Sequence, residues 1–414
     1  MIKLLSLHKW VLSITLLLSQ FAFSKTITVC KTCNVKSIKK AISVAKSDDT
    51  ILIKKGTYKE YNLLIDKPLK LIGENYPIID GGDRGEIVRV TSDNVTIDGL
   101  FIINVGTSYT SDHAAIRVVR SKHFLIQNVV LEKLFFGIYI EKSHHGKVYH
   151  NRIIGDAKDE YNSGNGIQLW YSKNILVENN IIQKVRDGIY LEFSDSITIK
   201  ENKSTDNLRY GLHFMFSNDD LYTKNHFENN GAGVAVMFSK RIKMINNTFK
   251  KNWGTAAFGL LLKEINDAEI KGNTFEENTI AINVEGTNRV EYSGNNFIRN
   301  GYAIKVLGAC YTNTFEKNNF LYNSFDVSYN ASINDNVFKD NYWSAYTGYD
   351  LEQDGIGDVP YRPVKLFSYI VNQTPETIIL MRSLFIDIID FSEKVSPAFT
   401  PDNLIDASPH MNRY

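Results

Sequence analysis

The chain has 414 residues, of which 43% are hydrophobic and 22% charged, so it can bury a sizeable core. Its 47 basic and 46 acidic residues nearly cancel, which argues against a nucleic-acid partner, because such proteins need excess cations for the phosphates. The 22 tyrosines and 23 phenylalanines, beside only 8 prolines, favour stacked β structure.

Residues 1–24 are typical of a signal peptide. Two lysines precede a largely apolar run at residues 10–23, and Ala22 and Ser24 fit the small residues before a cleavage point. The run is too short to span a membrane, and no other stretch of about 20 apolar residues follows it. We therefore expect an exported protein that ends in a soluble compartment.

The mature chain opens with a Cys30-Lys-Thr-Cys33 motif. In an exported protein this spacing indicates a local disulfide, and a metal site or a redox pair is the alternative. Cys310 lies in an apolar context and is expected to be a buried thiol.

Apolar residues repeat at helical spacing over residues 35–46, which predicts a helix that covers the N-terminal end of the fold.

A repeat of about 22 residues decides the fold class. Each unit contains a small residue followed by alternating apolar positions, and successive units are 22, 29, 22, 23, 22, 26, 22 and 22 residues apart. Stacked coils of short strands would pair each strand with its neighbours about 4.8 Å away. The pattern predicts an all-β, single-stranded, right-handed parallel β-helix. The small residues are Ala115, Gly137, Gly166, Gly188, Gly211, Gly233, Gly259, Ala281 and Ala303.

A second series of asparagines runs in step with the first. Asparagine tolerates the left-handed backbone of a tight corner, and stacked amides can hydrogen-bond along the axis. We therefore place these residues at corners between strands. The series is Asn128, Asn151, Asn180, Asn202, Asn225, Asn247, Asn273, Asn296, Asn319 and Asn336.

Three segments are expected along the chain: the signal at residues 1–24, the β-helix with its N-terminal cap at residues 25–345, and a C-terminal region at residues 346–414. The repeat fades after Asn336, so the back cover is expected to begin near residues 341–343. Residues 375–394 predict one helix, because proline and glutamate suit its start and a broad apolar arc follows. The polar residues 396–414 are expected to fold only on a partner.

Outward positions on the middle coils carry unusual side chains. The residues two and four places after each small residue should face away from the core. Trp170, Tyr190 and Leu261 stand there and predict a partner surface, because a contiguous exposed apolar patch usually marks one. The alternative is that a loop of the same chain, such as the insertion at residues 155–163, covers the patch.

His213, Met215 and Met237 form a sharper hypothesis within this patch. His213 and Met215 are two apart on one expected strand, and Met237 is one coil further. Thioether sulfur together with imidazole suits Cu(I). The sequence therefore offers a copper site here, and simple apolar contact is the alternative.

The segment after residue 349 partly matches a calcium loop. Acids occupy positions 1, 3, 5 and 9, a glycine occupies position 6, and a backbone carbonyl would serve at position 7. Tyr361 stands where a bidentate glutamate is expected. A structural calcium ion and a plain turn both remain open. The candidate ligands are Asp350, Glu352, Asp354, Ile356 and Asp358.

Six segments stand out in this order: residues 209–215, 232–238, 259–264, 341–343, 358–364 and 380–383. Taken together, they resemble the NosD family of periplasmic maturation proteins for nitrous oxide reductase. The resemblance covers nearly the whole mature chain. It implies partnership with ABC-transporter subunits similar to NosF and NosY, with a copper chaperone and with nitrous oxide reductase. It also implies that the middle patch meets the chaperone or copper and that the C-terminal helix and tail meet the transporter.

Two other functional classes compete with this non-catalytic reading. Many parallel β-helices cleave or epimerise acidic polysaccharides, which requires clustered carboxylates beside a base. The candidates in this sequence are few: Asp80 with Asp83 and Arg84 in an early turn, and the pair Asp112 and His113. A passive surface adhesin is the third class, and it would have no transporter partner.

Overall fold

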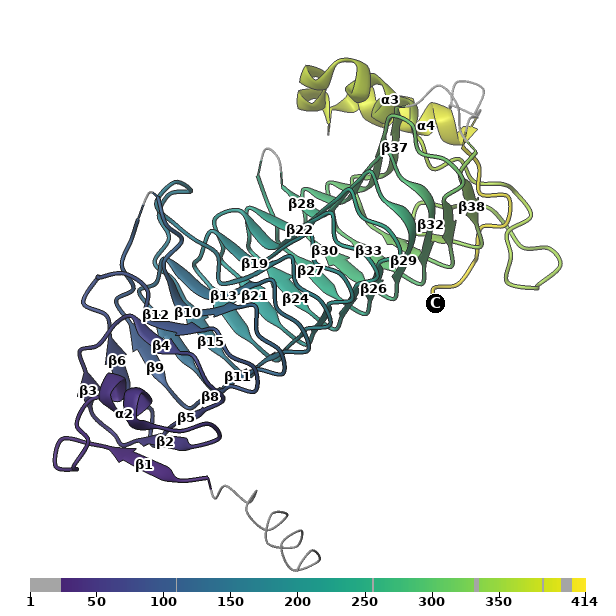
Figure 1. Ribbon diagram of the computed structural model, residues 1–414. Coiled ribbons are helices and arrows are strands. Elements are labelled where there is room, and N and C mark those ends of the chain that lie inside the picture. Colours follow the sequence, from purple (N-terminus) through teal and green to yellow (C-terminus); the bar gives the residue numbers. More distant parts are fainter. Residues whose placement is uncertain (1–23, 109, 255–256, 331–334, 382, 396–403) are drawn as a thin grey trace, which may run out of the picture.

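The chain folds into an elongated stack of coils, seen end to end in Figure 1. The computed structural model describes residues 24–414 except 109, 255–256, 331–334, 382 and 396–403. Almost the whole predicted signal peptide therefore lies outside the described residues. Each coil contributes one short strand to each of three parallel sheets, so the predicted right-handed parallel β-helix is confirmed.

Among the described residues, the three sheets contain 14, 12 and 13 strands. The 14-stranded sheet is built from β1 (Thr26–Val29), β2 (Thr50–Ile53), β5 (Lys70–Gly73), β8 (Thr96–Asp98), β11 (Leu125–Gln127), β14 (Lys147–Tyr149), β17 (Leu176–Glu178), β20 (Thr198–Lys200), β23 (Leu221–Thr223), β26 (Lys243–Ile245), β29 (Asn266–Lys271), β32 (Asn288–Ser293), β35 (Thr314–Glu316) and β38 (Val337–Lys339). The 12-stranded sheet is built from β4 (Leu63–Ile65), β7 (Val88–Val90), β10 (Ala114–Val119), β13 (Phe136–Glu141), β16 (Ile167–Trp170), β19 (Asp187–Glu192), β22 (Tyr210–Met215), β25 (Ala232–Met237), β28 (Phe258–Lys263), β31 (Ile280–Glu285), β34 (Tyr302–Leu307) and β37 (Phe325–Asn330). The 13-stranded sheet is built from β3 (Thr57–Tyr58), β6 (Ile78–Asp80), β9 (Phe101–Ile103), β12 (Val130–Glu132), β15 (Arg152–Ile154), β18 (Ile181–Gln183), β21 (Lys203–Thr205), β24 (His226–Glu228), β27 (Thr248–Lys250), β30 (Thr274–Glu276), β33 (Asn296–Ile298), β36 (Asn319–Leu321) and β39 (Tyr342–Trp343).

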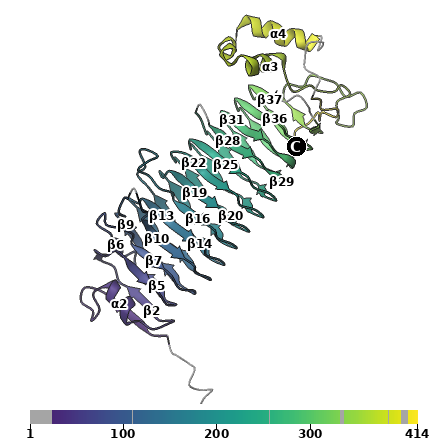
Figure 2. The ribbon, with the colours of Figure 1, turned by 45° about the horizontal axis from the view of Figure 1, so that its top comes forward.

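The predicted repeat of small residues falls on the 12-stranded sheet, and its spacing has a steric cause. At Gly188, a Cβ atom would lie 1.9 Å from Ser204 Oγ and 2.5 Å from Gly211 O, so no larger side chain fits. The next residues alternate between a continuous apolar core and the outer face. Figure 2 shows the strands of successive coils lying side by side along the axis.

Buried asparagines form a hydrogen-bonded ladder, but its register differs from the sequence prediction at several places. Each amide Nδ2 donates to the Oδ1 of the asparagine one coil further, as from Asn180 to Asn202 at 2.9 Å. Asn296 and Asn319 are not members, because they begin β33 and β36, and the preceding residues take their place. Asn128 is only half-buried and lies at a corner with a left-handed backbone, outside the ladder. Asn336 belongs to a separate pair with Asn313. The ladder is Asn151, Asn180, Asn202, Asn225, Asn247, Asn273, Asn295, Asn318 and Asn341.

The N-terminal end is covered by α2 (Ile38–Val44), within the predicted helical segment. Glu60 holds the start of this helix, because its carboxylate accepts hydrogen bonds from the backbone N–H groups of Ile38 and Lys39, each at 2.8 Å. Cys30 and Cys33 form a disulfide, and Cys310 is a buried free thiol. The predicted local disulfide and buried cysteine are therefore present.

The C-terminal region differs from the prediction in two ways. Residues 375–394 do not form one helix: the segment divides into η1 (Pro375–Leu380) and α4 (Leu384–Val395), and α3 (Leu366–Gln373) precedes them. We expected residues 396–414 to fold only on a partner, but residues 404–414 fold back on the last coil of the same chain. No helix among the described residues has the length and apolar character needed to cross a membrane.

Asp406 is the residue that holds this returning tail in place. Its side chain is fully buried, and one carboxylate oxygen accepts hydrogen bonds from Asn341 N, Asn341 Nδ2 and Trp343 Nε1 at 3.1, 3.0 and 2.9 Å. Asn341 is the last amide of the ladder, so the carboxylate terminates the whole series. The tail therefore caps the hydrogen bonds of the coil stack rather than extending into solvent.

A buried carboxyl under α3 predicts a pH-dependent stability. Burial raises the pKa of Asp326 to about 6, although Asn323 and Lys365 oppose the shift. The fold therefore favours the protonated acid, and the free energy of unfolding falls as the pH rises from about 4 to about 6. Asp326→Asn keeps an oxygen that can accept from Asn323 and removes the charge. We expect this variant to gain about 1–3 kcal/mol at neutral pH.

Urea denaturation between pH 4 and pH 7.5 measures this effect. The wild type should lose stability up to about pH 6, and the Asp326→Asn curve should be flatter over the same interval. A variant less stable than the wild type at neutral pH would contradict the assignment.

Candidate functional site

The three predicted copper ligands lie together on the outer face of the 12-stranded sheet. His213 pairs in register with Tyr190 on one side and Ala235 on the other. Met215 pairs directly with Met237, so the two thioether side chains start from adjacent strands. Leu212 and Phe214, which alternate with them, lie in the core. The sequence pattern therefore placed these three side chains correctly relative to one another.

His213 is buried, however, and the expectation that it faces solvent is wrong. Only 7% of its surface is exposed. The rings of Tyr190 and Tyr210 pack against the imidazole, with ring centroids 5.0 and 4.7 Å away. Met215 and Met237 are half-buried and lie at the edge of this covered region.

Neither ring nitrogen of His213 makes a hydrogen bond, although both are inaccessible to solvent. The nearest charged atom is an oxygen of Asp187, 3.5 Å from Nδ1, a contact at the limit of hydrogen-bond distance. Arg209 binds both oxygens of Asp187, at 2.9 and 2.6 Å. Burial opposes the charge on Asp187, but its contacts with His213 and Arg209 outweigh burial, so the pKa of this carboxyl lies below its ordinary value. The aspartate is therefore held ionised, and a buried imidazole next to it has an unused ring nitrogen.

This ion pair was not anticipated from the sequence. Asp187 and Arg209 are 22 residues apart, which is one coil, so they occupy adjacent strands. The sequence does contain a pattern that indicates this pair. An acid stands directly before one small residue, Gly188, and an arginine stands two places before the next one, Gly211. Buried salt bridges are costly unless fully paired, so this one is more informative about a special site than about stability.

An exposed aromatic ladder beside the methionines was also missed. The residues that follow the last outward position of four successive coils are aromatic, and each adopts a left-handed backbone with φ between 48° and 53°. Their rings stack with centroids 4.7, 5.1 and 5.1 Å apart. Bulky side chains are uncommon in this conformation, so the position is chosen against backbone preference. We call these four residues the aromatic ladder: Tyr171, Phe193, Phe216 and Phe238.

The predicted partner surface is accordingly displaced from the strands toward this corner. Trp170 and Tyr190 are half-buried, and Leu261 is only 9% exposed, so Leu261 contributes little. The hydrogen bond to Asp187 raises the pKa of Arg209 and burial raises that of Tyr210, and the negative charge of Glu160, in the insertion at residues 155–163, adds to both shifts. The aromatic ladder is more open, with Tyr171 at 46% and Phe238 at 44% exposure.

The side chains fit a soft metal ion better than a hard one. No group of three or more histidine, cysteine, aspartate or glutamate side chains among the described residues could hold a metal ion. Methionine is not one of those four residue types. The two thioethers, together with the imidazole of His213, match the preference of Cu(I) for sulfur and imidazole. The fit rests on the unused ring nitrogen, because a histidine with both nitrogens hydrogen-bonded would have none for a metal.

The predicted calcium loop has no support in its geometry. Asp350 accepts hydrogen bonds from the backbone of Asp354 and Gly355, Asp354 accepts from Ile356, and Asp358 accepts from Leu351. The carboxylates thus satisfy the backbone of the loop itself and do not converge. The plain turn, which was the alternative, accounts for the loop without an ion.

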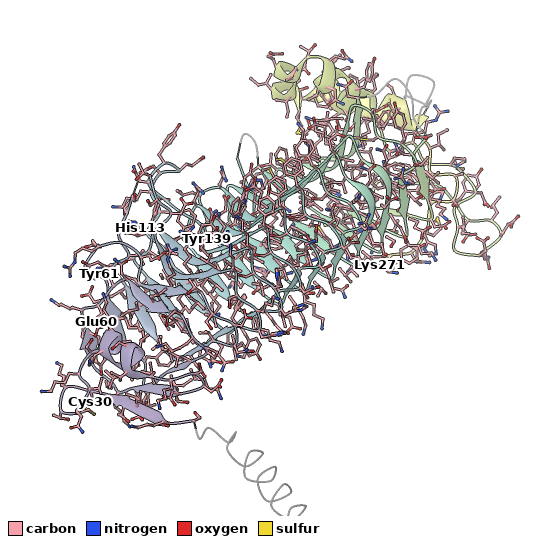
Figure 3. All side chains as sticks on the ribbon, viewed as in Figure 1. Cys30, Glu60, Tyr61, His113, Tyr139 and Lys271 are labelled. Atoms are coloured by element: carbon pink, nitrogen blue, oxygen red, sulfur yellow. A yellow bond between two sulfur atoms is a disulfide. The ribbon has the colours of Figure 1, made fainter. Side chains whose placement is uncertain are left out.

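The N-terminal coils carry a polar pocket that bears on the enzyme alternative. It has a volume of about 510 Å³ and lies under the loop that contains His113, which Figure 3 labels together with Tyr139 on the same side of the stack. Two of its three acids are engaged in ion pairs, Glu86 with Arg89 and Glu141 with Arg117, and the third, Asp112, is next to His113 in the chain. No pair of free carboxylates stands beside a base in this pocket.

Comparison with known proteins finds a similarity to one family. A model described as "Periplasmic copper-binding protein (NosD)" matches residues 149–348, and one described as "Right handed beta helix region" matches residues 24–218. A relative from Pseudomonas aeruginosa, named "Probable ABC transporter binding protein NosD", is 29% identical over 405 residues, covering 84% of this chain and 85% of its own. The relative of the same name from Stutzerimonas stutzeri is 25% identical, covering 84% and 83%. The chain is therefore similar to the NosD family over most of its length.

Solved structures place this chain within a broad fold class. The Family 28 exopolygalacturonase of Yersinia enterocolitica superposes with a TM-score of 0.53 over 77% of this chain and 78% of its own, at 12% identity. At that identity the likeness concerns the β-helix alone. The copper-binding family match spans the coils that carry His213, Met215, Met237 and the aromatic ladder.

Proposed function

We propose that this protein is the periplasmic binding component of an ABC transporter and helps to assemble the copper sites of nitrous oxide reductase. The observation that carries the proposal is the patch in which Met215 and Met237 pair in register beside a buried imidazole without a hydrogen bond. Similarity to the NosD family supports it, because the matching model is named for copper binding and the relatives for ABC-transporter binding.

Copper is the cargo in this proposal, held transiently as Cu(I). His213 supplies a ring nitrogen, and Met215 and Met237 supply sulfur. Tyr190 and Tyr210 exclude water from the imidazole by packing against it. The ionised Asp187 next to the ring favours a positive ion there. The aromatic ladder provides the surface on which a copper chaperone docks, since it is exposed and adjoins the methionines.

The contact with the transporter is assigned to the C-terminal helices. They project from the last coils, as Figures 1 and 2 show. Four large apolar side chains of α4 are exposed although α4 is a folded helix in contact with α3. Surfaces of this kind on soluble domains usually bind a partner. These residues are Leu384 at 75%, Phe385 at 59%, Ile388 at 54% and Phe391 at 67% exposure.

Co-purification from membranes tests this assignment. Replacing the four exposed residues of α4 by glutamine should abolish capture of transporter subunits similar to NosF and NosY, because it removes the apolar contact area. The coil stack should keep its circular dichroism spectrum. A control with Tyr161→Gln and Tyr322→Gln changes two aromatic residues elsewhere that are at least as exposed, at 91% and 75%, and should leave capture intact. Undiminished capture by the α4 variant would refute this contact.

A further inference from the structure

The disulfide between Cys30 and Cys33 lies in a turn that does not depend on it. Cys30 N donates to Val35 O at 3.2 Å, Cys33 N donates to Cys30 O at 3.3 Å, and Val29 pairs with Val35 as a bridge. The adjacent helix α2 is held separately by Glu60. A disulfide between residues three apart closes a very short loop, so it removes little entropy from the unfolded chain. The turn can therefore keep its shape when the disulfide opens.

Both cysteines are accessible from the N-terminal end of the stack. Each is partly exposed, and Figure 3 shows Cys30 at the outer end, coils away from Tyr139. Cys33 lines a groove of about 730 Å³ that follows β1, the edge strand of its sheet. Lys25 and Lys46 line the same groove together with one acid, Asp49, and Lys31 stands between the two cysteines, so the lysines outnumber the acid. The environment is thus open and cationic, which favours thiolates once the pair is reduced.

We propose that Cys30 and Cys33, when reduced, form a second Cu(I) site that is separate from His213, Met215 and Met237. A dithiol reductant transfers two electrons and two protons to the disulfide and is itself oxidised to a disulfide. Cu(I) then displaces the two thiol protons and binds both sulfurs. The neighbouring lysines offset the negative charge of the resulting bis-thiolate complex. The oxidised pair has no thiolate to offer, so the redox state of these cysteines controls copper binding.

Anaerobic Cu(I) titration of the full chain against a chromogenic chelator tests this proposal. The protein is used either oxidised or reduced with dithiothreitol, which is then removed. We expect the reduced wild type to bind one more Cu(I) per chain than the oxidised protein. Cys30→Ser/Cys33→Ser should lose that additional equivalent, whereas Cys310→Ala should keep it, because Cys310 is buried and distant in sequence.

The two copper proposals can fail independently. The variant His213→Gln/Met215→Leu/Met237→Leu should still bind the additional Cu(I) ion that requires reduced Cys30 and Cys33, even if it loses the Cu(I) ion at the outer patch. Equal copper binding by reduced and oxidised wild type would overturn the cysteine site. Loss of the additional equivalent in the triple variant would show that the two sites are not separate. Thermal unfolding of Cys30→Ser/Cys33→Ser checks that the cap remains folded.

Discussion

Replacing His213 by glutamine and both Met215 and Met237 by leucine is expected to weaken Cu(I) binding at the outer patch by about 100-fold. The three donors come from two adjacent strands whose register is set by backbone hydrogen bonds, so few other side chains can replace them. Methionine-to-leucine changes conserve volume and cost under about 1.5 kcal/mol each, so the fold should survive. Competition titration with the Cys30–Cys33 pair oxidised isolates this site.

Met244→Leu is the matched control for this experiment. Met244 lies in the core with 1% exposure, so the change alters methionine content without touching the patch. Its Cu(I) affinity should equal that of the wild type. An unchanged affinity in the triple variant would leave the patch as apolar contact alone, which was the alternative reading of the sequence.

The second large effect concerns Asp406, where alanine should lower the free energy of unfolding by about 3 kcal/mol or more. The change leaves Asn341 N and Trp343 Nε1 without an acceptor, and it leaves one of the two N–H groups of Asn341 Nδ2 unpaired, because the other still donates to Phe315 O. Each unsatisfied buried group costs about 1–3 kcal/mol. The tail would also lose its attachment to the last coil. Chemical denaturation, followed by tryptophan fluorescence, measures the loss.

Asp406→Asn should be intermediate, since it retains one oxygen that can accept some of these bonds. Asp66→Ala removes an acid whose contact with Lys67 is long at 3.7 Å and exposed, and it should change stability by less than about 0.5 kcal/mol. If Asp406→Ala were as stable as Asp66→Ala, the tail would not be the cap that the hydrogen bonds describe.

The coil stack was predictable because its signal recurs in every unit. A small residue, required where backbones approach closely at Gly188, is followed in each coil by inward apolar residues. The register of the asparagine ladder was harder to predict. Asn295-Asn296 and Asn318-Asn319 are pairs, and only the geometry shows which amide turns inward to meet the next coil.

The site was predictable in its register but not in its exposure. Spacing alone put His213, Met215 and Met237 on one face, whereas the burial of His213 depends on the Tyr190 and Tyr210 rings. Corner positions with a left-handed backbone favour asparagine and glycine. Aromatic residues there contradict that backbone preference, so the sequence pattern did not predict the aromatic ladder. The folded tail depends on contacts between Asp406 and residues more than 60 positions earlier, which no local pattern reveals.

The copper content of the purified complex between this chain and its transporter subunits, after loading with Cu(I) under oxidising conditions for the Cys30–Cys33 pair, is the most direct measurement. The wild-type complex should retain one copper ion per chain. The complex with His213→Gln/Met215→Leu/Met237→Leu should assemble equally well and retain none, because the patch and α4 are separate surfaces. Equal copper in both complexes, or no complex with the wild-type chain, would contradict the proposed function.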